Sequence, residues 1–300
     1  MKPTDDLEVI NSIYKPYKYT IKGNVKILNC NDKDIVLKRK CNILHNRFQY
    51  LDSRGFSNYV PLIDSSRSNY DIFPYIYENK IPYEQKGNDL ARVVAIMHAK
   101  TCYNKDIDES VYDNIYTNIT NNCDYLIDYY SRLYDDLFPL KYHKPHEIIL
   151  IDSYSKINNT ISFCKSEIEK WYTLVSEKRN QRVTLIHNNL KLDHFLKGSD
   201  DYLISFDNSR FDTPVIDLVK LYKEEYDKLD FSELLNNYLY HFSYNEDELK
   251  LFFVLITIPD EICFKEDNYK NVDLITNLIN YINKTESLVW PYYSNNKEIE

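Results

Sequence analysis

The sequence is poor in glycine, with only four glycines among 300 residues. Phosphate-binding loops such as GxGxxG and GxxxxGK[ST] need several glycines close together, because their backbone N–H groups must approach the anion. No such cluster occurs in this chain. The sequence therefore excludes a glycine-rich phosphate loop of either kind.

Paired cysteines are also missing. The six cysteines are widely spread, with no CxxC pair and no Cys/His group at zinc-site spacing. Zinc sites bring their ligands from short, recognisable spacings, so the pattern argues against one. We expect free and mostly buried thiols, as is usual for a protein of a reducing compartment.

Long hydrophobic segments are absent too. The longest apolar run lies near residues 249–259, well short of the roughly 20 residues that span a bilayer. Residues 1–6 lack the basic-then-apolar pattern of a signal peptide. We therefore expect a cytoplasmic protein without a membrane span.

Basic charge is scarce. The net charge is −9, and the densest basic cluster is the three-residue run 38–40. Nucleic-acid-binding proteins usually carry a basic face or stripe that neutralises phosphates. We expect no nucleic-acid partner. The hydrophobic content of 43% and charged content of 28% are those of a globular chain.

The first part of the chain is rich in strand patterns. A short helix is expected over 7–14 and a longer one over 42–54, stopped by Gly55. The expected strands cover residues 19–22, 25–28, 35–38, 59–64 and 70–77. Strands and helices do not alternate regularly, which favours an antiparallel sheet with one packed helix.

The rest of the chain is mainly helical. Helices are expected over 89–100, 113–136, 153–179, 216–226, 231–242, 246–256 and 274–282, and short strands over 183–187, 195–196 and 202–206. The join between the two parts falls within residues 76–83. The sequence thus predicts an α+β fold of two lobes, a β-rich lobe over 1–78 and a helical lobe over 79–300.

One stretch is far more specific than the others. Residues 185–218 read LIHNNLKLDHFLKGSDDYLISFDNSRFDTPVIDL. This resembles the catalytic segment of the aminoglycoside phosphotransferase and choline kinase superfamily, whose pattern is HxDxxxxN, a hairpin, I-D-[FW], then a Pro and D-L. The matching positions are His187, Phe206, Pro214 and 217–218.

Two upstream segments extend the resemblance. Residues 36–38 stand where that superfamily carries a phosphate-contacting lysine, and residues 90–98 resemble its LA..L..LH helix. The resemblance implies a two-lobed protein-kinase-like fold, ATP and Mg²⁺ as cofactors and Lys38 as a nucleotide contact. It also implies a structural role for His187 and for Asp217, which would brace the loop.

A narrower similarity concerns the end of the segment. Phe206-Asp207 followed by residues 211–214 is similar to the spore-coat kinase-like subgroup of Gram-positive bacteria. That similarity implies a bacterial protein and, as an alternative to the plain cytoplasm, a spore-associated location.

Three positions depart from the superfamily pattern. Asn189 replaces the catalytic aspartate, His194 the metal-binding asparagine and Ser205 the second-motif aspartate. Phosphoryl transfer relies on a positioned carboxylate and on Mg²⁺ that neutralises phosphate charge. Asn189 cannot accept a proton, and Mg²⁺ prefers oxygen ligands to imidazole. Binding of Mg²⁺–ATP should be weakened together with turnover.

Two carboxylates are candidates to replace the missing ones. Asp207 lies two residues after Ser205, so in an ideal strand it shares that face and could bind the metal. Asp193 could act as the base. No acidic residue lies between Lys38 and Leu51. We therefore expect Lys38 to be unpaired by protein, or satisfied by a bound anion.

Three functions remain open. The first is a pseudokinase that binds a small molecule or a protein partner without transferring phosphate. The second is a divergent ATP-dependent small-molecule phosphotransferase that uses Asp207 or Asp193. The third is a structural protein of a spore-envelope-type assembly.

Overall fold

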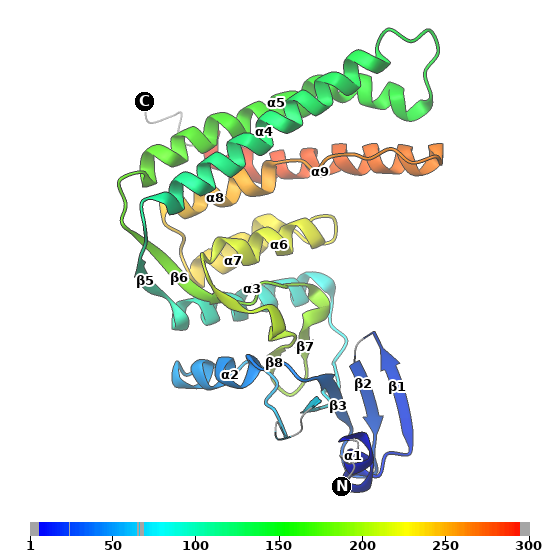
Figure 1. Ribbon diagram of the computed structural model, residues 1–300, viewed down its shortest axis with the longest axis vertical. Helices are drawn as coiled ribbons and strands as arrows, with labels where there is room; N and C mark the ends of the chain where they lie inside the picture. The colour runs from blue at the N-terminus through cyan, green and yellow to red at the C-terminus, as the bar shows by residue number, and fades with distance from the viewer. Residues whose placement is uncertain (1–5, 24, 65, 67–68, 295–300) are drawn as a thin grey trace.

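The computed structural model describes residues 6–23, 25–64, 66 and 69–294. The chain forms two lobes, as the sequence predicts: a small antiparallel sheet carrying the N-terminus, and a larger helical lobe (Figure 1). The predicted boundary at 78/79 falls between the last strand of the sheet and the first long helix.

The small lobe is built on one four-stranded sheet. Its strands are β1 (Lys18–Lys22), β2 (Val25–Asn29), β3 (Ile35–Arg39) and β4 (Tyr70–Pro74), paired antiparallel in that order. Side chains alternate between the two faces of a strand. Ile35 and Leu37 are buried in a small core beneath helix α1 (Asp6–Tyr14), which contributes Ile10. Alternation therefore turns Val36 and Lys38 toward the large lobe.

Helix α2 (Leu44–Ser53) packs between the lobes. Leu44, Phe48 and Leu51 recur at helical spacing and are buried. Gly55 ends the helix with a φ of 70°, a left-handed conformation that costs glycine little. The predicted helix and its stop are both confirmed.

The predicted strand over 59–64 is wrong. The segment makes only isolated bridges, from Tyr59 to Leu203 and from Asp64 to Ile72. Pro61 lies in its middle and cannot donate a ladder hydrogen bond. The segment instead crosses between the lobes and makes one bridge to each.

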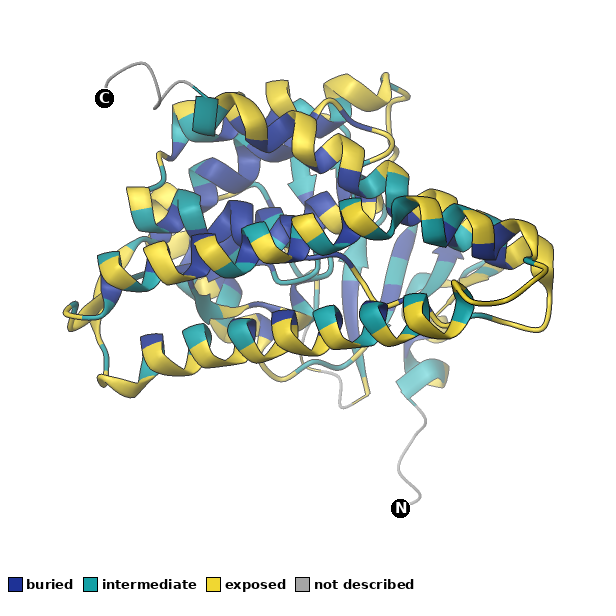
Figure 2. Cartoon of the chain, turned by 90° about the horizontal axis from the view of Figure 1, so that it is seen from above, coloured by how far each residue is buried: buried dark blue, intermediate teal, exposed yellow. Residues whose placement is uncertain are grey.

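The large lobe consists mainly of the predicted helices, most of them longer than expected. They are α3 (Tyr83–Thr101), α4 (Ser110–Leu137), α5 (Pro145–Val175), α6 (Val215–Glu225), α7 (Phe231–His241), α8 (Glu246–Thr257) and α9 (Asn268–Ser294). Their buried residues form stripes that face the interior (Figure 2). Within the described ranges, no helix is long and apolar enough to cross a membrane.

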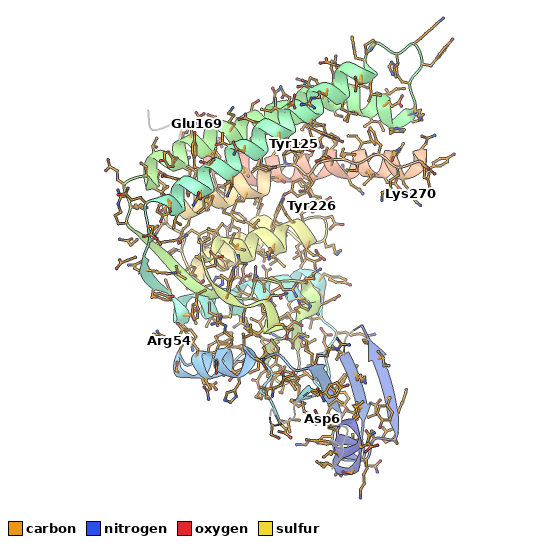
Figure 3. The ribbon with its side chains drawn as sticks, in the orientation of Figure 1. Asp6, Arg54, Tyr125, Glu169, Tyr226 and Lys270 are labelled. Carbon is orange, nitrogen blue, oxygen red and sulfur yellow. The ribbon has the colours of Figure 1, made fainter. Side chains whose placement is uncertain are left out.

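The outer helices form a layer of their own. α4 and α5 lie side by side, and α5 also packs on α8 and α9 (Figure 1). Tyr125 of α4, labelled in Figure 3, donates a hydrogen bond to Glu261 at 2.6 Å and joins α4 to the segment before α9. All six cysteines are free, as predicted; three are buried, and Cys263 is exposed.

Short strands and turns carry the loop of the recognised motif. A three-stranded sheet joins β5 (Tyr103–Asp106), β6 (Asn180–Ile186) and β9 (Arg210–Asp212), and β7 (Phe195–Lys197) pairs with β8 (Asp201–Leu203). The 3₁₀ turns are Leu192–His194 and Phe206–Asn208. The strand predicted over 202–206 therefore ends early, and its last residue begins a turn.

The β7–β8 hairpin sits tightly against the join between the lobes. A Cβ added at Gly198 would lie 2.8 Å from Ile76 Cγ2. The backbone N–H of Asn79 donates to the Lys197 carbonyl at 2.7 Å. These contacts fix the join beside the hairpin, where the lobes face each other.

Candidate functional site

A cavity of about 500 Å³ lies between the two lobes. Val36, Lys38 and Phe73 line it from the small sheet, and Leu196 and Leu203 from the β7–β8 hairpin. Its size is within the range of small-molecule pockets, which usually combine apolar walls with a few polar groups. Its lining residues come from β1, β2, β3, β4, α2, α3, β7, β8 and the segments beside them.

The cavity brings together four of the residues singled out in the sequence. Lys38, Asp193, Ser205 and Asp207 all line it. The other three, His187, Asn189 and His194, belong to the loop behind this wall and contact one another and the backbone.

Lys38 is paired with Asp207. Its ammonium donates to the Asp207 carboxylate, and the side chains are 21% and 29% exposed. The prediction that Lys38 has no protein partner is therefore wrong. The prediction considered only acids near Lys38 in sequence, whereas its partner lies 169 residues further along. The pair ties β3 of the small lobe to the Phe206–Asn208 turn of the large lobe.

Helix α2 presents an apolar face to Lys38. Leu44 and Phe48 line the cavity from this helix. Phe48 stacks on Tyr59 with ring centroids 4.3 Å apart. The one acid at the helix end, Asp52, accepts a hydrogen bond from the Tyr59 hydroxyl at 2.5 Å. As expected from its position, Asp52 is engaged away from Lys38.

Ser205 adopts a left-handed conformation, with φ 68° and ψ 45°. Such backbone is uncommon for a residue with a Cβ and persists when its neighbours hold it. On one side Ile204 donates to the His194 carbonyl at 2.9 Å, and on the other Phe206 is buried. The strand assumed for Ser205 and Asp207 is thus replaced by a kink and a 3₁₀ turn, although both residues still reach the cavity.

Asp217 of α6 braces the loop after β6 from the interior of the large lobe. This buried carboxylate accepts backbone hydrogen bonds from His187 at 2.7 Å and from Asn188 at 2.6 Å. His98 of α3 donates to it from Nε2 at 3.1 Å, and the other ring nitrogen of His98 is hydrogen-bonded to the Tyr238 hydroxyl of α7 at 2.6 Å. Burial alone would raise the pKa of Asp217, but its hydrogen bonds and the nearby histidines hold that pKa below its usual value. The predicted brace is present.

His187 has the contacts of a positioning residue. It is fully buried, and its Nε2 donates to the Ile204 carbonyl at 2.7 Å. Its ring meets Phe206 edge-on with centroids 4.9 Å apart. Burial lowers the pKa of His187, so its imidazole is neutral near pH 7. Through Ile204 and Phe206, His187 sets the backbone on both sides of Ser205.

Asn189 and His194 are joined within the loop. His194 Nδ1 donates to the Asn189 carbonyl at 2.7 Å. This bond commits one imidazole nitrogen to the backbone. Asp193, next to His194 in the sequence, is an exposed carboxylate that lines the cavity.

The residues at these positions do not fit a Mg²⁺ ion. Mg²⁺ takes oxygen ligands in near-octahedral geometry, usually including one or two carboxylates. His194 offers nitrogen, Ser205 offers a neutral hydroxyl, and Asp207 is committed to Lys38. Throughout the described part of the chain, no group of three or more His, Cys, Asp or Glu side chains is placed to hold a metal.

Sequence reasoning missed a second ion pair at the cavity. Lys86 of α3 contacts Glu78 of the join between the lobes at 2.5 Å, and both residues line the cavity. Their separation of eight residues matches no regular spacing within one helix or strand. The pair forms because the join turns back over the first turns of α3.

No protein-family model matches the sequence, and no curated protein matches it significantly. Solved structures do match in fold. An aminoglycoside phosphotransferase from Alicyclobacillus acidocaldarius subsp. acidocaldarius superposes with a TM-score of 0.74 at 12% identity, covering 99% of this chain and 98% of that one. A spectinomycin phosphotransferase solved with AMP gives a TM-score of 0.51 at 10% identity, over 98% and 95% of the two chains. This chain therefore has the two-lobed kinase-like fold of the aminoglycoside phosphotransferases.

Proposed function

We propose that this protein is a pseudokinase, which binds a ligand or partner through the cavity between its lobes and does not transfer phosphate. The observation that carries the proposal is the Lys38–Asp207 ion pair. In this pair, Asp207 lies two residues after Ser205, the position of the superfamily's metal ligand. Its partner Lys38 is the lysine that the resemblance assigns to phosphate contact. Active kinases pair this lysine with a helix glutamate and leave the carboxylate at the metal position for Mg²⁺. Here the lysine is paired with a carboxylate beside the metal position itself.

The chemistry of the loop supports the same proposal. A positioned general base contributes about 10²–10⁴-fold to a proton transfer, and an asparagine amide at 189 supplies none of it. Transfer to a hydroxyl also depends on cations that neutralise the developing phosphate charge. Of the cationic groups in the cavity, Lys38 is already neutralised by Asp207.

The proposal is tested by Mg²⁺–ATP turnover with a panel of alcohols and amines. We expect no phosphorylated product and no ATP hydrolysis above a protein-free control. Mg²⁺-dependent turnover that disappears in Asp207→Ala or Asp193→Ala would refute the proposal.

A restored variant makes that test sharper. Asn189→Asp, His194→Asn and Ser205→Asp together return the catalytic aspartate and the two metal ligands of the superfamily pattern. We expect this triple variant to bind ADP about tenfold more tightly when Mg²⁺ is added, since two oxygen ligands have been regained. Equal gains with and without Mg²⁺ would show that the substitutions act on something other than the metal.

A divergent phosphotransferase is the second candidate, and Asp193 is the observation that favours it. Its carboxylate is exposed at the cavity wall, four residues from Asn189. If it acts as the base, Asp193→Asn abolishes turnover while ligand affinity is retained. The assembly-protein hypothesis stays a prediction from the subgroup resemblance.

A further inference from the structure

The charged side chains at the cavity compensate one another. Three of each sign are among the described residues that line it: Lys22, Lys38, Lys86, Glu78, Asp193 and Asp207. Lys38 is paired with Asp207, and Lys86 with Glu78. The remaining two, Lys22 and Asp193, are exposed. The cavity therefore offers no excess of positive charge to an anion.

The remaining wall is largely apolar and comes from two opposed sides. Val36 and Phe73 are directly opposite each other across the β3–β4 pair, on the face of the sheet that lines the cavity. Leu196 and Leu203 line it from the β7–β8 hairpin of the other lobe. Apolar surfaces on two sides suit a flat ring that buries both of its faces.

A phosphate group would meet an unfavourable environment here. To reach Lys38 it must displace Asp207, leaving a carboxylate beside the incoming anion. If it does not displace Asp207, it sits near carboxylates, while Lys38 and Lys86 are held in ion pairs and Lys22 is exposed at the cavity rim. Like charges at such distances repel most strongly where the dielectric is low.

We infer that the cavity takes an uncharged, flat heteroaromatic molecule of nucleoside size and discriminates against its phosphorylated forms. This inference rests on the proposed function, and names the class of ligand for the same cavity. The cavity volume of about 500 Å³ accommodates a molecule of that size. The Lys38–Asp207 pair is the element that sets the preference.

The test compares molecules that differ only in phosphate charge. Adenosine, guanosine and their 5′-mono-, di- and triphosphates are titrated calorimetrically, each with and without Mg²⁺. We expect a nucleoside to bind, and its triphosphate to bind with an affinity at least about tenfold lower, because repulsion grows with the number of charges. Adding Mg²⁺ should not make the triphosphate bind as tightly as the nucleoside.

Two variants assign the preference to the ion pair. Asp207→Asn removes the competing carboxylate at constant size and should strengthen diphosphate binding about tenfold, leaving the nucleoside unaffected. Lys38→Met removes the cation and should leave nucleoside binding intact while phosphate binding falls further. Asp260→Asn, which also removes an aspartate paired with a lysine but lies outside the cavity lining, should change neither.

Three results would overturn the inference. One is a wild-type protein that binds the di- or triphosphate as tightly as the nucleoside. Another is the failure of both nucleosides to bind the folded protein. The third is an Asp207→Asn variant with the same phosphate affinity as Asp260→Asn. None of these requires turnover, so the inference can fail while the absence of phosphate transfer stands.

Discussion

The segment of residues 187–208, between β6 and β9, has two sides that differ in kind. Its rear is a closed network in which Asp217 receives hydrogen bonds from His187, Asn188 and His98, all within the core. Its front faces the cavity and carries Ser205 and Asp207. The rear is what folding requires, because buried donors and acceptors left unpaired cost stability. The front carries no such requirement, so its chemistry can differ while the fold stays the same.

Breaking the rear should have the largest effect. Asp217→Ala removes the common acceptor of two backbone N–H groups and His98, leaving buried donors without partners. We expect the free energy of unfolding to fall by about 3–5 kcal/mol, as when one partner of a buried charged network is removed. Urea unfolding followed by circular dichroism measures this loss.

A surface aspartate provides the control for that variant. Asp128 pairs with Arg132 on the exposed side of α4. Asp128→Ala should change the free energy of unfolding by less than about 1 kcal/mol. A loss at Asp217 no larger than that at Asp128 would contradict the importance of the rear network.

The pH dependence of stability also belongs to the rear. Burial lowers the pKa of His187 in the folded protein, so the unfolded chain binds a proton more readily. Stability is therefore complete above the unfolded pKa, about 6.5, and is lost as pH falls from there toward the lower folded pKa. One such proton gives a slope of at most about 1.4 kcal/mol per pH unit.

Thermal midpoints between pH 7.5 and 5 measure that slope. His187→Gln retains a donor for the Ile204 carbonyl but does not titrate, so its slope should be smaller than that of the wild type. His146 is the matched second contributor, because burial lowers its pKa as well. An unchanged slope in His187→Gln would mean that His146 or other groups carry the dependence.

The front should yield the smallest effect on stability. The Lys38–Asp207 pair is partly exposed, and such pairs contribute about 1 kcal/mol or less. A double-mutant cycle with Lys38→Met and Asp207→Asn isolates the coupling between the two side chains. We expect about 0.5–1 kcal/mol of coupling in the free energy of unfolding. A coupling of several kcal/mol would make the front as much a part of folding as the rear.

Much of the fold could be predicted from the sequence because periodic patterns report on packing. The spacing of Leu44, Phe48 and Leu51 predicted α2, and the alternation around Lys38 predicted its strand. The strand over 59–64 failed because Pro61 was not weighed against its apolar neighbours. The C-terminal end of α9 was missed because the polar run at residues 283–287 interrupts the apolar pattern and Pro291 lies inside the helix, where proline usually ends one.

The site was predictable in part, for a different reason. The motif fixed which positions matter, and it located Asn189, His194 and Ser205 in one loop and the turn beside it. It could not give the partner of Lys38, since that depends on how the lobes meet and on the turn at Phe206–Asn208. The assumed strand geometry placed Asp207 at the cavity, where it lies, but could not show that its carboxylate pairs with Lys38.

We propose that the front of the segment 187–208 does not support metal-dependent phosphate chemistry. The most direct measurement is calorimetric titration of ADP into the wild-type protein with and without Mg²⁺. We expect Mg²⁺ to leave the affinity for ADP unchanged, because the residues at 194 and 205 do not fit the ion and Asp207 is held by Lys38. An affinity that rises tenfold or more with Mg²⁺ would contradict it.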